Sequence, residues 1–205
     1  MARTGVRDPA SKERIVEAAR RCIAQLGLHG ATVRAIAAEA DVSTGYVMHY
    51  FPDKQQLAAA VLAANNARAG ARVARASRKR KGLAALEAAI EAVLPMDAER
   101  RVEWQVWGAF WTASAADGSA ADGLLGARRA LERILAVPFA EALAAGELPD
   151  SLDVDYECAR LVTLAAGLGL TGAGSPADVR RLARRMLQDH LSSLAATRTG
   201  RTRAS

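Results

Sequence analysis

The chain has 205 residues, of which 51% are hydrophobic, and it carries a formal net charge of +6 with an isoelectric point near 9.9. This length allows one compact body or a small module joined to a larger one. Alanine-, leucine-, arginine- and glutamate-rich stretches with few β-branched runs predict an all-α protein. The positive charge favours a polyanionic partner.

Cysteine usage and hydropathy argue against a disulfide-stapled or membrane-spanning chain. Cys22 and Cys158 stand alone in helical patterns and are expected to be buried thiols in a reducing compartment. The N-terminus is polar and lacks an apolar signal core. The longest apolar run, from Leu161 to about Gly174, is shorter than the roughly 20 residues that a membrane helix needs. We therefore expect a soluble, cytoplasmic protein.

The first predicted helix follows a basic arm that carries Arg3 and Arg7. Ser11 is expected to cap this helix, and Gly27 and Gly30 are expected to end it. The spacing of its apolar residues is helical. They are Ile15, Ala19, Cys22, Ile23 and Leu26.

Two short helices come next. Thr32 is expected to cap the first of them, and residues 41–43 form a tight turn. The second runs from Thr44 to Tyr50, where Pro52 stops it. This arrangement of two short helices around a three-residue turn is typical of a helix-turn-helix, whose second helix enters the major groove of DNA.

A long helix follows the two short ones. Asp53 is expected to cap it, and Gln56, three residues on, completes a capping-box pattern. The helix is predicted to reach the basic run at 78–81, where Gly82 breaks it.

The rest of the chain predicts five more helices, which gives about nine in total. Proline, glycine and aspartate punctuate them, and residues 197–205 are expected to form a basic, disordered tail. The predicted ranges are 83–94, 98–115, 121–145, 152–170 and 176–195.

Residues 41–51 include many side chains that can form hydrogen bonds and few apolar side chains to bury. Hydroxyl and imidazole groups suit contacts to phosphates and base edges, and a glycine lets the backbone approach. The residues concerned are Ser43, Thr44, Gly45, Tyr46, His49 and Tyr50. The alternative is an exposed amphipathic helix with an N-cap and no ligand.

The residues from Thr32 to Gly45 and from His49 to Leu57 closely resemble the TetR family of bacterial transcriptional regulators. The resemblance covers about residues 11–62 and implies a DNA-binding domain there, with a ligand-binding and dimerising domain at 63–196. It assigns packing roles to Val33, Ile36, Ala37, Ala40, Val42, Phe51 and Leu57. With the preceding argument, it places DNA contacts at Thr32, Arg34, Ser43, Thr44, Gly45, Tyr46, Met48, His49, Tyr50 and Lys54. A phosphate at Lys54 also suits the N-terminus of a helix.

Two positions depart from the family pattern. Asp41 stands where glycine is commonest in the turn, and aspartate tolerates a left-handed backbone better than most residues. Met48 stands where a phosphate-contacting tyrosine is frequent. The residues His49 to Phe51 instead resemble the BetI-like branch of the family, which is typified by a choline-responsive regulator.

A cluster of aromatic residues marks the sixth predicted helix. Trp104, Trp107 and Trp111 share one face, Phe110 lies among them, and Glu103 adjoins them. This pattern suits a pocket wall for a flat or cationic ligand, because indole faces attract quaternary ammonium groups. The alternative is that the tryptophans fill a core otherwise built from alanine. The segment "ERRVEWQVWGAFW" also resembles the corresponding helix of BetI-like regulators.

Four arginines form a stripe along the fourth helix, namely Arg68, Arg72, Arg75 and Arg78. We expect a solvated face, or pairing with acids such as Glu87 and Glu91. The glycine-rich segment 167–174 lacks a preceding strand and is predicted to be a loop rather than a phosphate site. Neither cofactor nor metal is expected, since the three histidines are scattered.

Selective DNA reading requires more than one short helix, so we expect a homodimer whose half-sites are about one helical turn, or a multiple of it, apart. The last two helices are the predicted interface. The sequence thus predicts a repressor that binds a palindromic operator and is released by a small molecule. An activator, an architectural DNA binder without effector, and a small helical enzyme using the tryptophan pocket are the alternatives.

Overall fold

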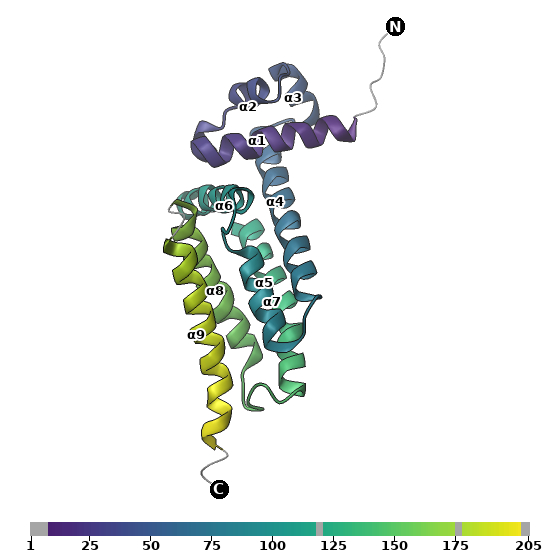
Figure 1. Cartoon of the computed structure of the whole chain (residues 1–205). Coiled ribbons are helices and arrows are strands. Elements are labelled where there is room, and N and C mark those ends of the chain that lie inside the picture. Colours follow the sequence, from purple (N-terminus) through teal and green to yellow (C-terminus); the bar gives the residue numbers. More distant parts are fainter. Residues whose placement is uncertain (1–7, 118–120, 175–177, 202–205) are drawn as a thin grey trace. The chain divides into compact units, whose positions relative to one another are not determined.

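The computed structural model describes residues 8–117, 121–174 and 178–201. These residues form nine α-helices and contain no strand (Figure 1), which confirms the all-α prediction. The helices are α1 (Pro9–Gly30), α2 (Val33–Glu39), α3 (Thr44–Tyr50), α4 (Lys54–Ser77), α5 (Gly82–Val93), α6 (Ala98–Asp117), α7 (Ala121–Ala144), α8 (Val154–Gly174) and α9 (Asp178–Arg201). The predicted arm with Arg3 and Arg7 lies outside the described residues, as does residue 176, where the last predicted helix was expected to begin.

The chain divides into two compact units. Unit 1 comprises Met1–Ala67 and Gln105–Leu124, and unit 2 comprises Arg68–Trp104 and Leu125–Ser205. Helices α4 and α6 are each continuous, so both contribute residues to both units.

Unit 1 contains the three N-terminal helices, in which α2 packs against α1 and α3 packs against α2 (Figure 1). Most of the residues predicted to pack here are buried, and Val33 and Val42 are half-buried. The buried apolar residues include Ile15, Ala19, Ile23, Ile36, Ala37, Ala40, Val47, Phe51, Leu57 and Val61. This small core fixes the orientation of α3.

Unit 2 is built from the end of α4, from α5, from the start of α6, from most of α7, and from α8 and α9. Helix α5 packs against α8 and α9, which also pack against each other. Its fully buried large side chains include Leu86, Ile90, Leu94, Leu135, Phe139, Leu148, Leu161 and Leu187. Within the described ranges, no helix combines the length and apolar character needed to cross a bilayer.

The start of α1 differs from the prediction that Ser11 caps it. Asp8 is the N-cap, and its carboxylate accepts hydrogen bonds from the backbone N–H groups of Ala10 and Ser11, both at 3.2 Å. Pro9 at the first helical position suits this start, because its missing N–H would have no helical partner there. Near the other end, Gly27 has φ 70°, so the regular helix does break at Gly27 before one further turn.

Helix α4 ends at Ser77, four residues before the predicted limit. The backbone N–H groups of Lys79 and Arg80 bond to carbonyls three residues back, which tightens the chain into a turn. Gly82, with φ 54°, begins α5.

Helices α8 and α9 are longer than predicted. The predicted loop at 167–174 is helical, because packing overrides the cost of roughly 1 kcal/mol that each glycine adds to a helix. The predicted tail is helical as far as Arg201, since arginine and alanine favour helix.

Candidate functional site

The turn between α2 and α3 is closed by backbone and side-chain hydrogen bonds. Thr32 caps α2 by accepting from the Ala35 N–H at 3.1 Å, and Ser43 caps α3 by accepting from the Tyr46 N–H at 3.1 Å. Asp41 has φ 54°, the left-handed conformation expected for it. The sequence therefore builds this turn without glycine.

One face of α3 is exposed. Thr44, Gly45, Met48 and His49 recur at helical spacing on this face, while Val47 points into the core and is fully buried. Thr32 and Arg34 on the preceding helix are also exposed. We call Thr44, Gly45, Met48 and His49 the α3 face.

The two tyrosines of α3 hold it against the start of α1. The Tyr46 hydroxyl donates to Ser11 Oγ at 3.0 Å, and Ser11 Oγ donates to Asp8 Oδ2 at 2.9 Å. The Tyr50 hydroxyl accepts from the Asp8 backbone N–H at 3.2 Å, and the two tyrosine rings lie 5.3 Å apart. Only 8% of Tyr50 is exposed, so its hydroxyl is used inside unit 1 rather than on the α3 face.

These contacts also shift the titration of the groups involved. The hydrogen bond to Ser11 lowers the pKa of Tyr46, and the hydrogen bond with Tyr46 raises the pKa of Tyr50. The hydrogen bond from the Ser11 hydroxyl lowers the pKa of Asp8. Sequence reasoning missed Asp8, although an aspartate before a proline is a helix-start signal.

Lys54 lies at the first position of α4, beside the end of α1. Its Nζ donates to the His29 carbonyl at 3.2 Å, and an ammonium group has two further donors. Asp53 caps α4 by accepting from the Gln56 N–H at 2.7 Å, as predicted. The Gln56 side chain also donates to Asp53 at 2.8 Å.

The aromatic residues of α6 fall in two different units. Trp104 belongs to unit 2, where its Nε1–H donates to the Val93 carbonyl at 2.7 Å and its ring packs against Gly169. Phe110 and Trp107 belong to unit 1 and are buried, and Trp111 is half-buried. Three of the four predicted pocket residues are therefore buried.

Asn66 joins three helices in unit 1. Its Oδ1 accepts from Trp107 Nε1–H at 2.8 Å, and its Nδ2 donates to the Gly123 carbonyl at 3.2 Å. The amide therefore links α4 to both α6 and α7. Sequence reasoning had no signal for this residue.

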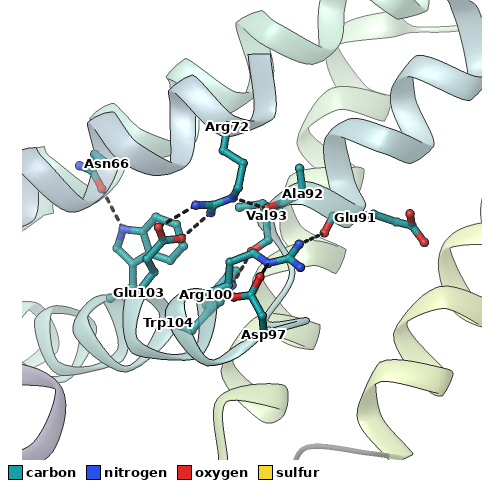
Figure 2. A network of polar contacts seen from close by, with 10 residues as sticks. Asn66, Arg72, Glu91, Ala92, Val93, Asp97, Arg100, Glu103 and Trp104 are labelled. Carbon is teal, nitrogen blue, oxygen red and sulfur yellow. Dashed lines mark hydrogen bonds and ion pairs between the residues drawn. The ribbon is translucent and has the colours of Figure 1, made fainter. Parts of the chain in front are cut away.

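In unit 2 a buried ion pair joins α4 to α6 (Figure 2). Glu103 is fully buried, and both of its carboxylate oxygens accept from the Arg72 guanidinium, one of them from Nη1 at 2.8 Å. Arg72 Nε also donates to the Ala92 carbonyl at 2.8 Å. Arg72 thus contacts the end of α5 as well.

The predicted acidic partners of the arginine stripe are engaged elsewhere. Glu91 pairs with Arg184 of α9 at 2.7 Å, and Glu87 accepts from Gln188 at 3.4 Å. For Arg72 the prediction of a solvated face or of pairing with these acids was wrong. The position of Glu103 among tryptophans was the sign that its side chain would be buried. A buried carboxylate needs a cation beside it.

The turn from α4 to α5 forms a cavity of about 320 Å³. Its lining residues are Ser77, Arg78, Lys79, Arg80, Lys81, Val137, Pro138 and Glu141. Glu141 and Glu147 accept from the Gly82 and Leu83 N–H groups at 3.3 and 2.9 Å. The backbone N–H groups at the start of α5 are therefore already hydrogen-bonded to acidic side chains of the protein itself.

Two family profiles match the chain. The profile of bacterial regulatory proteins of the tetR family matches residues 15–61, and that of the BetI-type transcriptional repressor C-terminal region matches residues 82–196. The chain belongs to the TetR family of bacterial transcriptional regulators. The C-terminal match shows that its second half is of the BetI type. This identity confirms the predicted family and a regulator rather than an enzyme.

Relatives of this TetR-family chain include regulators of known name. The HTH-type transcriptional regulator BetI of Burkholderia cenocepacia (strain HI2424) is 29% identical over 208 residues, which cover 96% of this chain and all of the relative. The HTH-type transcriptional repressor AcnR of Corynebacterium efficiens is 43% identical over 54 residues, or 26% of this chain and 29% of that protein.

Solved structures of TetR-type regulators share the fold. A transcriptional regulator from Saccharomonospora viridis in complex with choline is 26% identical with a TM-score of 0.81, covering 90% of this chain and 97% of that one. A transcriptional regulator from Rhodococcus sp. Rha1 is 28% identical with a TM-score of 0.79, covering 91% and 97%.

Proposed function

We propose that this TetR-family chain is a sequence-specific DNA-binding repressor that a small molecule releases from its operator. The observation that carries the proposal is the α3 face. Its four exposed positions lie on a helix that is capped by Ser43 and fastened to α1 through Tyr46 and Tyr50. A recognition helix needs this combination, because its exposed side chains must be free to contact DNA while the rest of the domain holds the helix in place.

The proposed contacts divide by chemistry. Thr44, Gly45, Met48 and His49 reach base edges, and Met48 offers an apolar contact to a thymine methyl group. The cationic and hydroxyl groups of Arg34, Lys54 and Thr32 contact phosphates. Ser43 and Tyr46 position α3, and Tyr50 is left out of the DNA contacts because it is buried.

The repressor is proposed to act as a homodimer on a palindromic operator in the cytoplasm. Both α8 and α9 expose large apolar side chains, namely Tyr156, Leu170, Leu182 and Met186. A second copy would bury them and place two α3 helices on successive half-sites. Residues 11–62 would then read DNA, and residues 63–196 would bind the effector and the partner.

Effector release requires that the ligand prefer one of two conformations. Helix α4 is continuous and contributes to both units, so a ligand that shifts it in unit 2 also changes unit 1. The BetI-type profile over residues 82–196 and the related regulator in complex with choline support a small-molecule effector, and we place its site in the C-terminal region. The aromatic residues Trp104, Trp107, Phe110 and Trp111 are the proposed reporters of its occupancy.

The test is fluorescence anisotropy of the full chain against DNA that flanks its own gene, with a scrambled duplex as control and both titrated over salt. Thr44→Ala and His49→Ala should each weaken selective binding by roughly 5- to 100-fold, as loss of a base contact does. Their Tm should stay that of the wild type, because both residues are exposed. Arg34→Ala should weaken binding to both duplexes, and it should reduce by about 1 the slope of log affinity against log salt concentration.

Val137→Ala is the matched control, since Val137 is exposed on α7 and is not among the proposed DNA and dimer contacts. It should bind as the wild type does. Equal affinity for both duplexes over the whole salt range would contradict the proposal and favour an architectural DNA binder. A promoter–reporter assay decides between repression and activation.

A further inference from the structure

We infer that the turn from α4 to α5 is a binding site for a small polyvalent anion, a metabolite that carries several phosphate or carboxylate groups. The site consists of Ser77, the basic run at 78–81 and Glu141 of α7, which line the cavity of about 320 Å³. All of these residues belong to unit 2. The inference does not depend on the proposed function, because none of them belongs to the proposed DNA contacts, to the proposed dimer interface or to the aromatic cluster of α6.

The four cations of the basic run have no acidic partner. Their side chains are exposed, and within the described ranges none of them forms an ion pair or a side-chain hydrogen bond. Glu141, which lines the same cavity, bonds to a backbone N–H group instead. Four like charges on consecutive residues repel one another, and an anion bound among them would relieve this repulsion.

Ser77 adds a hydroxyl group to the cavity. Only 8% of this residue is exposed, and its hydroxyl forms no hydrogen bond to any described residue. Polar side chains that are buried to this extent normally have a partner. A hydroxyl in a helix can donate to the carbonyl four residues back, as those of Thr112 and Thr163 do in this chain. The Ser77 hydroxyl is instead free to donate to a bound oxyanion.

Backbone hydrogen bonds hold the basic run in its turn. The N–H groups of Arg78 and Arg80 donate to the carbonyls of Ala74 and Ser77, both at 3.1 Å. Lys81 then has extended backbone and precedes the first residue of α5. Because the backbone forms this turn, the cationic side chains are not needed to stabilise it and are free to contact a ligand.

The acidic side chains at the end of α7 are attached to the same turn. Glu141 Oε2 accepts from the Gly82 N–H at 3.3 Å, and Glu147 Oε2 accepts from the Leu83 N–H at 2.9 Å. A Cβ at Gly82 would overlap the Glu147 carboxylate, so the two segments lie close together. The cavity is therefore formed before a ligand binds, which lowers the entropic cost of binding.

Size and charge define the class of ligand. A volume of about 320 Å³ is at the lower end of the range for small-molecule pockets and is too small for a duplex or a folded partner. The four cations and the Glu141 carboxylate leave three positive charges unbalanced. Guanidinium and ammonium groups bind phosphate and carboxylate oxygens alike. Pyrophosphate and citrate are therefore the two arms of the test.

The experiment titrates the full chain, without DNA, with sodium pyrophosphate and with sodium citrate by calorimetry, at equal ionic strength in sodium chloride. Lys79→Gln/Arg80→Gln removes two cations from the site. Arg128→Gln/Arg129→Gln is the matched control, because it removes the same charge from two exposed neighbours on α7 that do not line the cavity. Tm is measured in parallel.

The wild type should bind at least one of the two anions saturably. Lys79→Gln/Arg80→Gln should weaken this binding about tenfold or more, and Arg128→Gln/Arg129→Gln should weaken it less than about twofold, because distant surface charges are screened by salt. The bound anion should raise the Tm of the wild type and of the control, and it should raise that of Lys79→Gln/Arg80→Gln less.

Two single variants test the other groups in the cavity. Ser77→Ala should weaken anion binding about tenfold, because a hydrogen bond to a charged group is lost. Glu141→Gln should strengthen it by about two- to tenfold, because a like charge is removed. The glutamine oxygen can still accept from the Gly82 N–H, so the turn keeps its attachment to α7.

Equal losses of affinity in the two double variants would show that surface charge alone attracts the anions, and this would overturn the site. So would the absence of saturable binding of both anions to the wild type. If neither anion binds and Lys79→Gln/Arg80→Gln reduces the salt dependence of DNA binding, the basic run is a DNA contact instead. If that variant does not fold, the two single variants decide: opposite shifts in affinity support the site, and unchanged affinity in both overturns it.

Discussion

Gly169 shows how the absence of one side chain sets the packing of α8. A Cβ at this position would overlap the six-membered ring of Trp104, whose indole N–H is already bonded to Val93. The ring cannot retreat without losing that bond, so the glycine is required for close approach. Gly167, two residues earlier, is exposed and has no atom within 4 Å of where its Cβ would lie.

These two glycines predict opposite effects for the same substitution. Gly169→Ala should lower the free energy of unfolding by about 1–3 kcal/mol, because it overpacks a buried ring. Gly167→Ala should raise it by up to about 1 kcal/mol, since alanine favours helix. Urea unfolding followed by tryptophan fluorescence measures both. Similar shifts of the same sign would contradict the proposed packing.

Single-residue pairings were the least predictable part of the site. Local rules account for the spacing of the tryptophans, for the caps at Thr32, Ser43 and Asp53, and for the left-handed conformation of Asp41. The Arg72–Glu103 pair does not, because its members lie 31 positions apart and only the packing of helices brings them together.

Helices α8 and α9 are joined by a buried acid–imidazole contact. His190 Nε2 lies 3.2 Å from Glu157 Oε2, and Arg160 Nη1 lies 3.4 Å from the other oxygen of Glu157. Burial, and then the charge of Arg160, lower the pKa of His190 below its ordinary value of 6.5, against the opposing effect of Glu157.

A lowered histidine pKa makes stability depend on pH in one direction. Below about pH 6.5 the unfolded chain takes up the proton on this histidine more readily than the folded chain does. The free energy of unfolding is therefore lowered below that pH and not above it. Between pH 7.5 and 5.5 the wild type should therefore lose more Tm than His190→Gln does. Thermal melts followed by circular dichroism test this, and parallel losses in the two proteins would contradict it.

Most helices could be located from the sequence because their apolar spacing and start signals are local. The errors are at boundaries, where tertiary contacts decide. Residues 167–174 were predicted to be a loop from their glycines, yet α8 continues because Trp104 needs a glycine opposite it. Likewise Asp8 rather than Ser11 caps α1, since the Asp8 carboxylate accepts two N–H groups and the Ser11 hydroxyl.

At the scale of the whole molecule, α8 and α9 each expose several apolar side chains in the single chain. Leu182 and Met186 lie one helical turn apart on α9, and they are 51% and 40% exposed. On α8, Tyr156 and Leu170 are exposed as well. These faces are the proposed dimer interface.

Charges on this surface should separate the proposed dimer. The wild type should have twice the chain mass of 21.6 kDa by light scattering at micromolar concentration, and Leu182→Glu/Met186→Glu should have the mass of one chain. The double variant should also lose selective operator binding, because one α3 reads too few base pairs. Val137→Glu, which changes an apolar position on α7 that is 62% exposed, should remain dimeric. A monomeric wild type would contradict the interface.

The way α3 is fastened also bears on how such a regulator diverges. Tyr46, Val47 and Tyr50 attach the helix, whereas the α3 face uses the four residues between and beside them, so the two sets are interleaved but separate. After gene duplication, substitutions on the α3 face can redirect one copy to new promoters while the scaffold stays intact. A change of target then needs no compensating change in the core, and libraries randomised at these four positions should consist largely of folded proteins.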